Sequence, residues 1–477
     1  MSAHHVRHRD LGLFSLLVLL LLWLPLPYGS NTVWATTLLE ILVFLLTMGW
    51  LVAYARRRTR PTPAFRAARG VLLLWLLWTL FIIIQLIPLP VEWLALLSPT
   101  AHARHQQVAA LFQQMPDYLP LSLDPGATLG RLMTTVAYGL LFCLTLLLVN
   151  SRTRLKFLAM ALLTSGLAQA LYGLIELYSG WHYQVNGSFV NYNHLAGYLG
   201  LTMALGIGLL LADLESWEDL VTWRQRLRQG LSVLFSLKIL VRSFLVVMVI
   251  ALVMTRSRMG NTAFFTSMML CGLVYLLCKR REVGKPALWL FISLLIVDVW
   301  VVSAWFGLDQ LVERLRTTDL AAESRDEVIR DAGSMLADYR LLGSGLGSYY
   351  AVFPYYRGSD VQGFYDHAHN DYAEFISESG LIGAVILGMM VLTAGWTAFQ
   401  AIRTRRDRLL AAMGFSSLMA MVTIAIHSTT DFNLQIPANA ATLMVIMALA
   451  WVARHHGRSH HHRRHTHHPS SVASVNA

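Results

Sequence analysis

The chain has 477 residues, of which 56% are hydrophobic and only 14% are charged. Soluble globular proteins contain roughly 45–50% apolar and about 25% charged residues, so this composition excludes an ordinary soluble protein. The three cysteines, Cys143, Cys271 and Cys278, all lie inside apolar runs. They therefore leave no pair for a disulfide framework or a thiolate metal site.

Apolar runs of about 20 residues, the length of a helix that crosses a bilayer, recur along the chain. Because these runs lack the short alternating segments of a membrane barrel, the sequence predicts an all-α polytopic membrane protein. We expect about twelve spans, at residues 11–28, 33–54, 71–90, 128–150, 155–178, 195–212, 238–255, 261–278, 287–306, 381–402, 409–428 and 438–453.

Alternate loops between these spans are strongly basic. They are residues 56–60, 152–156, 224–228, 279–285 and 403–408, together with the C-terminal tail. The positive-inside rule places these loops and both termini in the cytoplasm. The net charge of +11 is therefore mainly an orientation signal that faces anionic lipid, and no nucleic-acid partner is expected.

The chain divides into three regions. Residues 1–180 are N-terminal transmembrane helices, residues 181–453 form a second membrane domain, and residues 454–477 are a His- and Arg-rich cytoplasmic tail predicted to be disordered. The first span follows basic residues like a signal peptide, but its length and the lack of an Ala-x-Ala site favour a retained span.

Two large loops are expected on the external side. Residues 91–127 are punctuated by prolines and contain a short amphipathic helix at about 103–115. Residues 307–380 are the longest polar stretch and contain helix-compatible sequence from about 323 to 342. The second loop is too long for a passive connector, so we expect chemistry there.

External arginines run against the orientation rule and need a local reason. Arg256 and Arg258 lie in a very short turn between two spans, where two guanidinium groups suit a phosphate or diphosphate. Snorkelling to lipid headgroups is the alternative. In the long loop, Arg325 stands directly before a helical run, whereas Asp326 and Arg330 have the i,i+4 spacing of an ordinary surface pair.

The segment 365–383 combines histidines and carboxylates. A helix that begins near Asn370 would place three carboxylates on one face: Asp371, Glu374 and Glu378. His367 and His369 precede it, and a histidine there can accept a proton near neutral pH while a carboxylate orients its ring. The alternatives are a polar structural cap and a divalent metal site, although the spacing matches no standard ligand set.

Two shorter external turns also carry polar groups. Residues 186–197 contain Asn191 and His194, and residues 427–437 contain His427 and Asp431. Polar groups at this depth need partners, so together they indicate a shared aqueous cavity, although each alone would be an ordinary structural residue. The glycine-rich segment 341–347 lacks the Lys-Ser/Thr ending of a phosphate loop and predicts only a tight loop after a helix.

These motifs carry a resemblance. His369-Asn370, nine residues, then Gly380-Leu-Ile-Gly383 resembles the His-Asn/Ser/Gln, x9, Gly-x-x-Gly signature of the O-antigen ligase and Wzy-type polymerase superfamily. Residues 187–197, 255–258, Arg325 with 342–347, and 431–438 are similar to that superfamily too. The resemblance covers roughly residues 180–445.

The resemblance implies a GT-C-like membrane glycosyltransferase of the bacterial inner membrane, with a large helical periplasmic loop and its active site on the periplasmic face. Such an enzyme moves a glycan from a polyprenyl diphosphate, usually undecaprenyl diphosphate, to an acceptor hydroxyl with inversion and without a metal or other cofactor. His369 then becomes the candidate base. The implied diphosphate clamp is Arg256, Arg258 and Arg325, and the further substrate-binding candidates are Asn191, His194, Asn370 and Asp431.

The resemblance leaves the acceptor open. Polymerisation of O-antigen or exopolysaccharide repeat units is favoured over ligation to lipid A-core, and a protein acceptor comes third. Expected partners are membrane lipids and other components of polysaccharide assembly. A transporter is the rival class, but the two halves of the chain do not resemble each other and the intramembrane acids are few, namely Glu40 and Asp298.

Overall fold

A computed structural model of the chain describes residues 10–113, 116–181, 183–213, 237–306, 325–361 and 365–457. The elements in chain order are α2 (Leu11–Trp23), η1 (Tyr28–Ser30), α3 (Val33–Ala55), α4 (Pro63–Ala67), α5 (Arg69–Leu86), β1 (Leu89–Pro90), α6 (Val91–Leu97), α7 (Pro99–Phe112), β2 (Tyr118–Leu119), α8 (Pro125–Leu148), α9 (Arg152–Tyr178), α10 (Tyr192–Ala212), α12 (Leu237–Met254), α13 (Arg258–Phe306), α15 (Arg325–Asp338), α16 (Tyr349–Val352), η4 (Phe353–Tyr355), α17 (Asp371–Thr404), α18 (Arg408–His427), η5 (Asn433–Gln435) and α19 (Pro437–His455).

Nine helices within these described ranges are long and apolar enough to cross a membrane. They are α3, α5, α8, α9, α10, the part of α13 from Arg258 to Arg280, α17, α18 and α19. Two further apolar helices, α2 and the segment Ala287–Ile296, are shorter, and α12 has 18 residues. The chain is therefore an all-α multi-pass membrane protein, and the count of twelve spans stays a prediction.

The first expected span, residues 11–28, is longer than the helix found there. Helix α2 ends at Trp23, and Pro25 and Pro27 follow it. Proline has no backbone N–H and its ring clashes with the preceding turn, so the helix does not continue. The chain then turns through η1, where Gly29 has a φ of 67°.

Helix α13 covers both the eighth and the ninth expected spans. All 49 of its residues are helical, including those of the stretch that the sequence predicts as a basic loop. A straight helix would separate Gly272 and Phe291 by roughly 28 Å. A Cβ atom added to Gly272 would nevertheless lie 3.1 Å from the Phe291 ring, so the chain reverses direction between these two residues.

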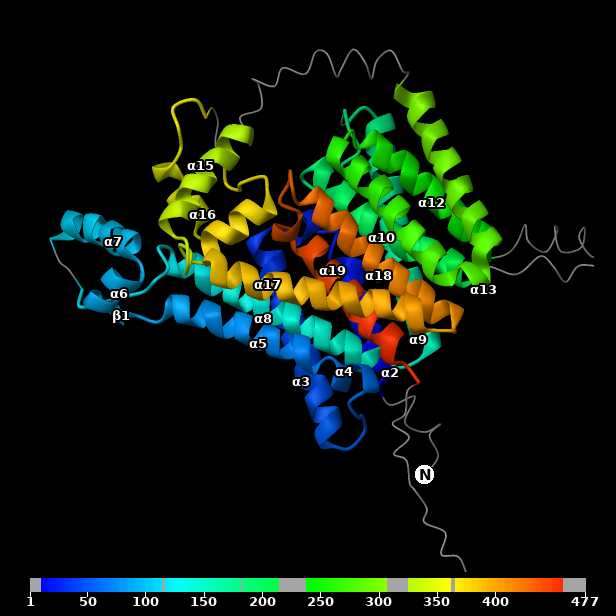
Figure 1. Cartoon of the computed structure of the whole chain (residues 1–477), viewed down its shortest axis with the longest axis horizontal. Coiled ribbons are helices and arrows are strands. Elements are labelled where there is room, and N and C mark those ends of the chain that lie inside the picture. The colour runs from blue at the N-terminus through cyan, green and yellow to red at the C-terminus, as the bar shows by residue number, and fades with distance from the viewer. Residues whose placement is uncertain are drawn as a thin grey trace, which may run out of the picture.

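Helix α10 lies at the centre of the bundle. In its most apolar window 94% of the residues are buried, against 22% in α3, which lies at the periphery (Figure 1). Glycines on α10 allow this close packing, because a Cβ at Gly208 would overlap the Ser416 hydroxyl of α18 and one at Gly206 would lie 2.8 Å from Leu163 of α9. Small residues at helix interfaces serve this purpose in membrane proteins generally.

Several of the basic segments lie together at one end of the bundle. The Arg154 guanidinium at the start of α9 donates to the Asp10 carboxylate at 2.7 Å. The Lys279 ammonium donates to the Arg405 carbonyl oxygen, and Arg405 donates to the carbonyl oxygens of Ala453 and His456 at the end of α19. Three of the loops predicted to share one side therefore meet at one end, which we name the basic end.

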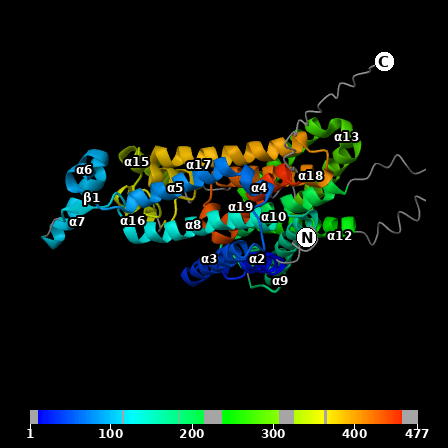
Figure 2. The same ribbon diagram turned by 90° about the horizontal axis from the view of Figure 1, so that it is seen from below.

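The opposite end carries a small cap of short elements. Strands β1 and β2 pair antiparallel, with Leu89 opposite Leu119, and helices α6, α7, α15 and α16 surround an apolar cluster that includes Leu94, Val328, Tyr349 and Ala368. Figure 2 shows α6, α7 and β1 at one extreme of the long axis and α12 and α13 at the other. The helices expected near residues 103–115 and 323–342 are found as α7 and α15.

Some predictions fall on other parts of the chain. Residues 214–236, with the basic loop 224–228, residues 307–324 and the tail 458–477 lie outside the described residues. The Asp326 side chain also lies outside the described residues, so its expected i,i+4 pair with Arg330 stays a prediction. Arg330 instead pairs with Asp331 and, at 2.9 Å, with Asp360.

Candidate active site

Helix α17 begins where the sequence predicts. Asn370 is its N-cap, and its side-chain oxygen accepts a hydrogen bond from the Ala373 N–H at 3.0 Å, the usual way to satisfy a free donor of the first turn. The Asn370 amide also donates to the Thr429 carbonyl oxygen at 2.8 Å. This side chain therefore ties the start of α17 to the end of α18.

The three carboxylates predicted to share a face do so. Asp371, Glu374 and Glu378 are all at most 2% exposed. The Asp371 carboxylate accepts hydrogen bonds from the Ser428 hydroxyl at 2.6 Å and from the Leu434 N–H at 3.1 Å. Asp371 thus holds the turn between α18 and α19 against the start of α17.

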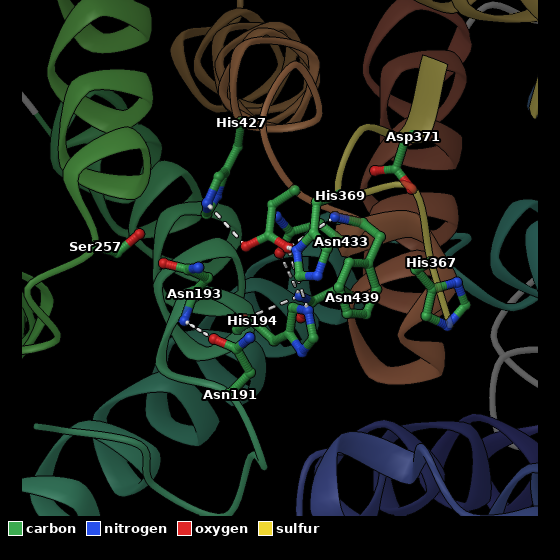
Figure 3. Close-up of polar contacts among 12 residues, drawn as sticks. Asn191, Asn193, His194, Ser257, His367, His369, Asp371, His427, Asn433 and Asn439 are labelled. Atoms are coloured by element: carbon green, nitrogen blue, oxygen red, sulfur yellow. Dashed lines mark hydrogen bonds and ion pairs between the residues drawn. The ribbon is translucent and has the colours of Figure 1, made fainter. Parts of the chain in front are cut away.

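Asp431, in that turn, lies among three histidines from three different parts of the chain. Its Oδ1 atom lies 3.6 Å from His194 Nε2 and 3.9 Å from His369 Nδ1, and its Oδ2 atom lies 4.0 Å from His427 Nε2. Figure 3 labels the three histidines, which come from different segments of the chain and lie close together. We call Asp431, His194, His369 and His427 the histidine centre.

The Asp431 carboxylate stays ionised in this environment. Burial by itself would raise its pKa, but the interaction with His194, the charge of His427 and the hydrogen bond from the Phe432 N–H outweigh burial and lower the pKa to about 2. A buried, permanently charged acceptor can orient a histidine ring and stabilise the imidazolium that forms when the ring takes up a proton.

His369 is the member of the centre that a substrate can reach. Its side chain is 19% exposed, against 5% for His194 and 1% for His427. Its backbone has a φ of 49°, which is uncommon for a residue with a side chain and is often found at functional sites. The ring packs edge-on against Phe432 and Tyr365.

Phe432 forms a shared wall beneath the histidines. The His194 and His369 rings meet it edge-on, with centroids 4.6 Å and 4.8 Å away, and the His367 ring stacks on it at 4.4 Å. The Phe432 ring therefore sets the spacing between His367 and the histidine centre.

His367 has a carboxylate partner of its own. Its Nδ1 atom lies 2.8 Å from Glu374 Oε1, and the second Glu374 oxygen accepts the Ala368 N–H at 2.9 Å. Burial lowers the pKa of His367, but the charge and hydrogen bond of Glu374 raise it more, so the net shift is upward. His367 and Glu374 were not expected as a pair.

The turn with Arg256 and Arg258 lies beside the start of α10. Both arginines are exposed, whereas Ser257 between them is buried and caps α13 by accepting the Gly260 N–H at 3.1 Å. A Cβ at Gly260 would lie 2.6 Å from the Ala196 Cβ, two residues after His194. Figure 3 shows Ser257 at the edge of the histidine centre.

Residues 243–388 match the family model described as O-antigen ligase. The resemblance inferred from the motifs is thereby confirmed over this segment, which is just under a third of the chain. No match to a curated protein was found. The O-antigen ligase segment contains the two arginines of the turn and His369, whereas His194 and Asp431 lie on either side of it.

The remaining predicted residues have more local roles. Asn191 caps α10 by accepting the Asn193 N–H at 2.8 Å, so it acts as a cap like Asn370. Arg325, inside the O-antigen ligase segment, is the first residue of α15, and its side chain lies outside the described residues. Helix α15 itself contributes to the cap cluster that also contains Ala368.

The glycine-rich segment of the O-antigen ligase region is a tight loop, as predicted. Gly343, Gly345 and Gly347 have φ values of 73°, 111° and 84°. A Cβ at Gly343 would overlap the Glu378 backbone, and one at Gly347 would lie 2.7 Å from the Arg131 side chain. These glycines let the loop press against α17 and α8.

Arg131 was not among the predicted site residues, although its position in the sequence is unusual. It lies near the end of α8 that is predicted to be external, against the orientation rule, as Arg256 and Arg258 do. Its charge acts on His367 in the structure. Within the described ranges, no group of three or more His, Cys, Asp or Glu side chains is arranged to hold a metal ion.

Proposed function

We propose that the protein is a membrane glycosyltransferase that moves a glycan from a polyprenyl diphosphate, such as undecaprenyl diphosphate, to an acceptor hydroxyl. The observation that carries the proposal is the histidine centre, in which an ionised buried carboxylate faces a reachable histidine of the O-antigen ligase segment. This is the arrangement that a general base needs.

His369 would act as that base. With its Nδ1 proton directed to Asp431 at 3.9 Å, the lone pair of Nε2 is the one that takes the proton of the acceptor hydroxyl. The acceptor oxygen then bonds to the anomeric carbon while the bond from that carbon to the diphosphate oxygen breaks. The polyprenyl diphosphate leaves with the electron pair, and inversion at the anomeric carbon follows.

Arg256 and Arg258 would bind the diphosphate. Both are exposed in a turn next to the histidine centre, and arginine offers paired donors that match phosphate oxygens. Their charge would stabilise the leaving group as it develops, which is the role that a divalent cation has in other phosphate chemistry. Arg325, at the start of α15, is the third member of this proposed clamp.

The proposed setting is the bacterial inner membrane, with the histidine centre on the periplasmic face. The gathering of basic loops at the opposite end of the bundle supports this orientation. A reporter enzyme fused after Leu346 should be active only in the periplasm. Cytoplasmic activity of that fusion would contradict the orientation.

We propose polymerisation of O-antigen or exopolysaccharide repeat units as the reaction, with ligation to lipid A-core as the second candidate. The purified protein, given a lipid-linked oligosaccharide and alternative acceptors, should release polyprenyl diphosphate and lengthen the glycan. Attachment to lipid A-core alone would identify a ligase, and movement of the donor without release of diphosphate would identify a transporter. A chelator should not reduce the rate; loss of activity that a divalent cation restored would contradict the arginine clamp.

A further inference from the structure

Arg131 is a basic residue of this site, and the proposed reaction gives it no role. It lies two turns into α8, and its methylene stem packs on Gly347, where a Cβ would lie 2.7 Å from Arg131 Cγ. Its side chain is half-buried, and no hydrogen bond or ion pair of its guanidinium occurs within the described part of the chain. Five N–H donors are thus held near the site without a protein acceptor.

The two buried carboxylates of α17 beside His367 and the glycine loop are already engaged. Glu374 accepts hydrogen bonds from His367 and from the Ala368 N–H, and Glu378 accepts the Tyr349 N–H at 2.9 Å. Arg131 and His367 are close enough that the arginine charge opposes protonation of the histidine. His367 is already paired with Glu374. The Arg131 guanidinium beside it is therefore the group that is available to an anion.

His367 lies on the side of the centre away from the arginine turn. In Figure 3, Ser257 of that turn and His367 stand on opposite sides of His369. An inverting displacement requires the leaving diphosphate and the attacking hydroxyl to lie on opposite faces of the anomeric carbon. If Arg256 and Arg258 hold the diphosphate, the His367 side receives the acceptor.

We propose that Arg131, assisted by His367, binds an acidic group of the acceptor glycan, a sugar carboxylate or a sugar phosphate. This inference rests on the proposed glycosyltransfer, and it specifies which class of acceptor the protein selects. Arg131 is a specificity-determining residue in this scheme, and the glycine loop is the element that positions it.

The test compares three acceptors with the same donor: an oligosaccharide that ends in glucuronic acid, its carboxyl-reduced glucose counterpart, and the glucose counterpart carrying a phosphate. A charge-assisted hydrogen-bond pair predicts an acceptor KM about 10–100-fold lower for an acidic acceptor than for the neutral one. The carboxylate and phosphate arms show which acid the site prefers.

Arg131→Ala should abolish this preference and leave the KM for the donor unchanged, and Arg131→Lys should retain part of it. Arg104→Ala is the matched control, because Arg104 lies on α7 of the cap and packs over the Tyr355 ring. An unchanged preference in Arg131→Ala would overturn the inference. A raised donor KM with an unchanged acceptor KM would also overturn it, by assigning Arg131 to the diphosphate clamp.

Direct binding separates this inference from the proposed function. If the wild-type protein transfers nothing, the glycosyltransferase proposal fails. Calorimetry with the glucuronate oligosaccharide alone would then still decide the anion site, since wild type should bind it and Arg131→Ala should not. Equal binding by both proteins would overturn the site as well.

Discussion

The two ends of the helix bundle both bury charge, but they hold it differently. At the basic end, Arg154 meets Asp10 at 2.7 Å and also donates to the Leu148 carbonyl oxygen at 2.9 Å. At the other end, three histidines lie 3.6–4.0 Å from Asp431, which is longer than a hydrogen bond.

This difference separates charge that holds the fold from charge that is available for chemistry. A buried pair at hydrogen-bond distance loses stability when either partner is removed, because the other is left uncompensated. Histidines that surround a carboxylate at longer distances are not fixed in a direct hydrogen bond, so they remain available to take up a proton. We therefore expect mutations at the basic end to change stability and mutations at the histidine centre to change rate.

His369→Gln should have the largest effect on rate. Loss of a positioned base lowers kcat by about 10²–10⁴, while donor binding stays near the wild-type value because the diphosphate is held by other residues. Single-turnover kinetics with a labelled donor would measure both. His367→Gln is the control and should affect kcat less; if it abolished transfer while His369→Gln left it intact, the base would be misassigned.

Arg154→Ala should have the largest effect on stability. It leaves the Asp10 carboxylate, whose residue is 5% exposed, without its partner, at a cost of about 3–5 kcal/mol. Denaturant unfolding in detergent would measure the loss, and the folded fraction should retain its kcat. Asp10→Ala in the same chain should recover part of the stability. A fall in kcat with unchanged stability would contradict the assignment of the basic end to stability and of the histidine centre to rate.

Replacement of Arg256 and Arg258 together by alanine should lower kcat/KM by about 10²-fold, the order expected from charged hydrogen bonds to a phosphate. The double lysine variant should recover only part of the activity, because an ammonium cannot form the paired contact of a guanidinium. Full activity of the double alanine variant would show that these arginines contact only lipid headgroups.

The smallest effect is a pH dependence of stability from Asp431. Its folded-state pKa of about 2 lies below the unfolded value of about 3.9, so ionised Asp431 stabilises the fold by about 2 kcal/mol above pH 4. This contribution is lost as the pH falls through 2. The stability of wild type should therefore fall more steeply with acid than that of Asp431→Asn. The same pH dependence of stability in both proteins would contradict the lowered pKa of Asp431.

Much of the fold was predictable because the bilayer imposes its own length and polarity on the sequence. The start of α17 at Asn370 was predictable as well, since an N-cap and a buried acidic face leave a local pattern. The helical backbone of the stretch between the two expected spans of α13 was not, because a basic stretch predicts a loop whether or not its backbone stays helical.

The histidine centre was predictable only in part. His194, His369 and Asp431 were candidates because each lies in a polar segment next to a predicted span. No local sequence pattern indicates that the three residues are close together. Their contact depends on the central position of α10 and on Asp371, which fixes the turn of Asp431. The pairing of His367 with Glu374 was not predictable either, because it joins a residue before the helix to one inside it and leaves no local pattern.

The position of Asp431 along the chain has a consequence for the order of synthesis. His194, the arginine turn and His369 all precede it, and the carboxylate emerges only with the turn between α18 and α19. Asn439 of α19 then donates to the His194 carbonyl oxygen at 2.9 Å. Under the proposed function, a nascent chain would insert most of its helices and expose its arginines before the carboxylate partner of His369 is in place. Transfer would then begin only after α19 has entered the membrane.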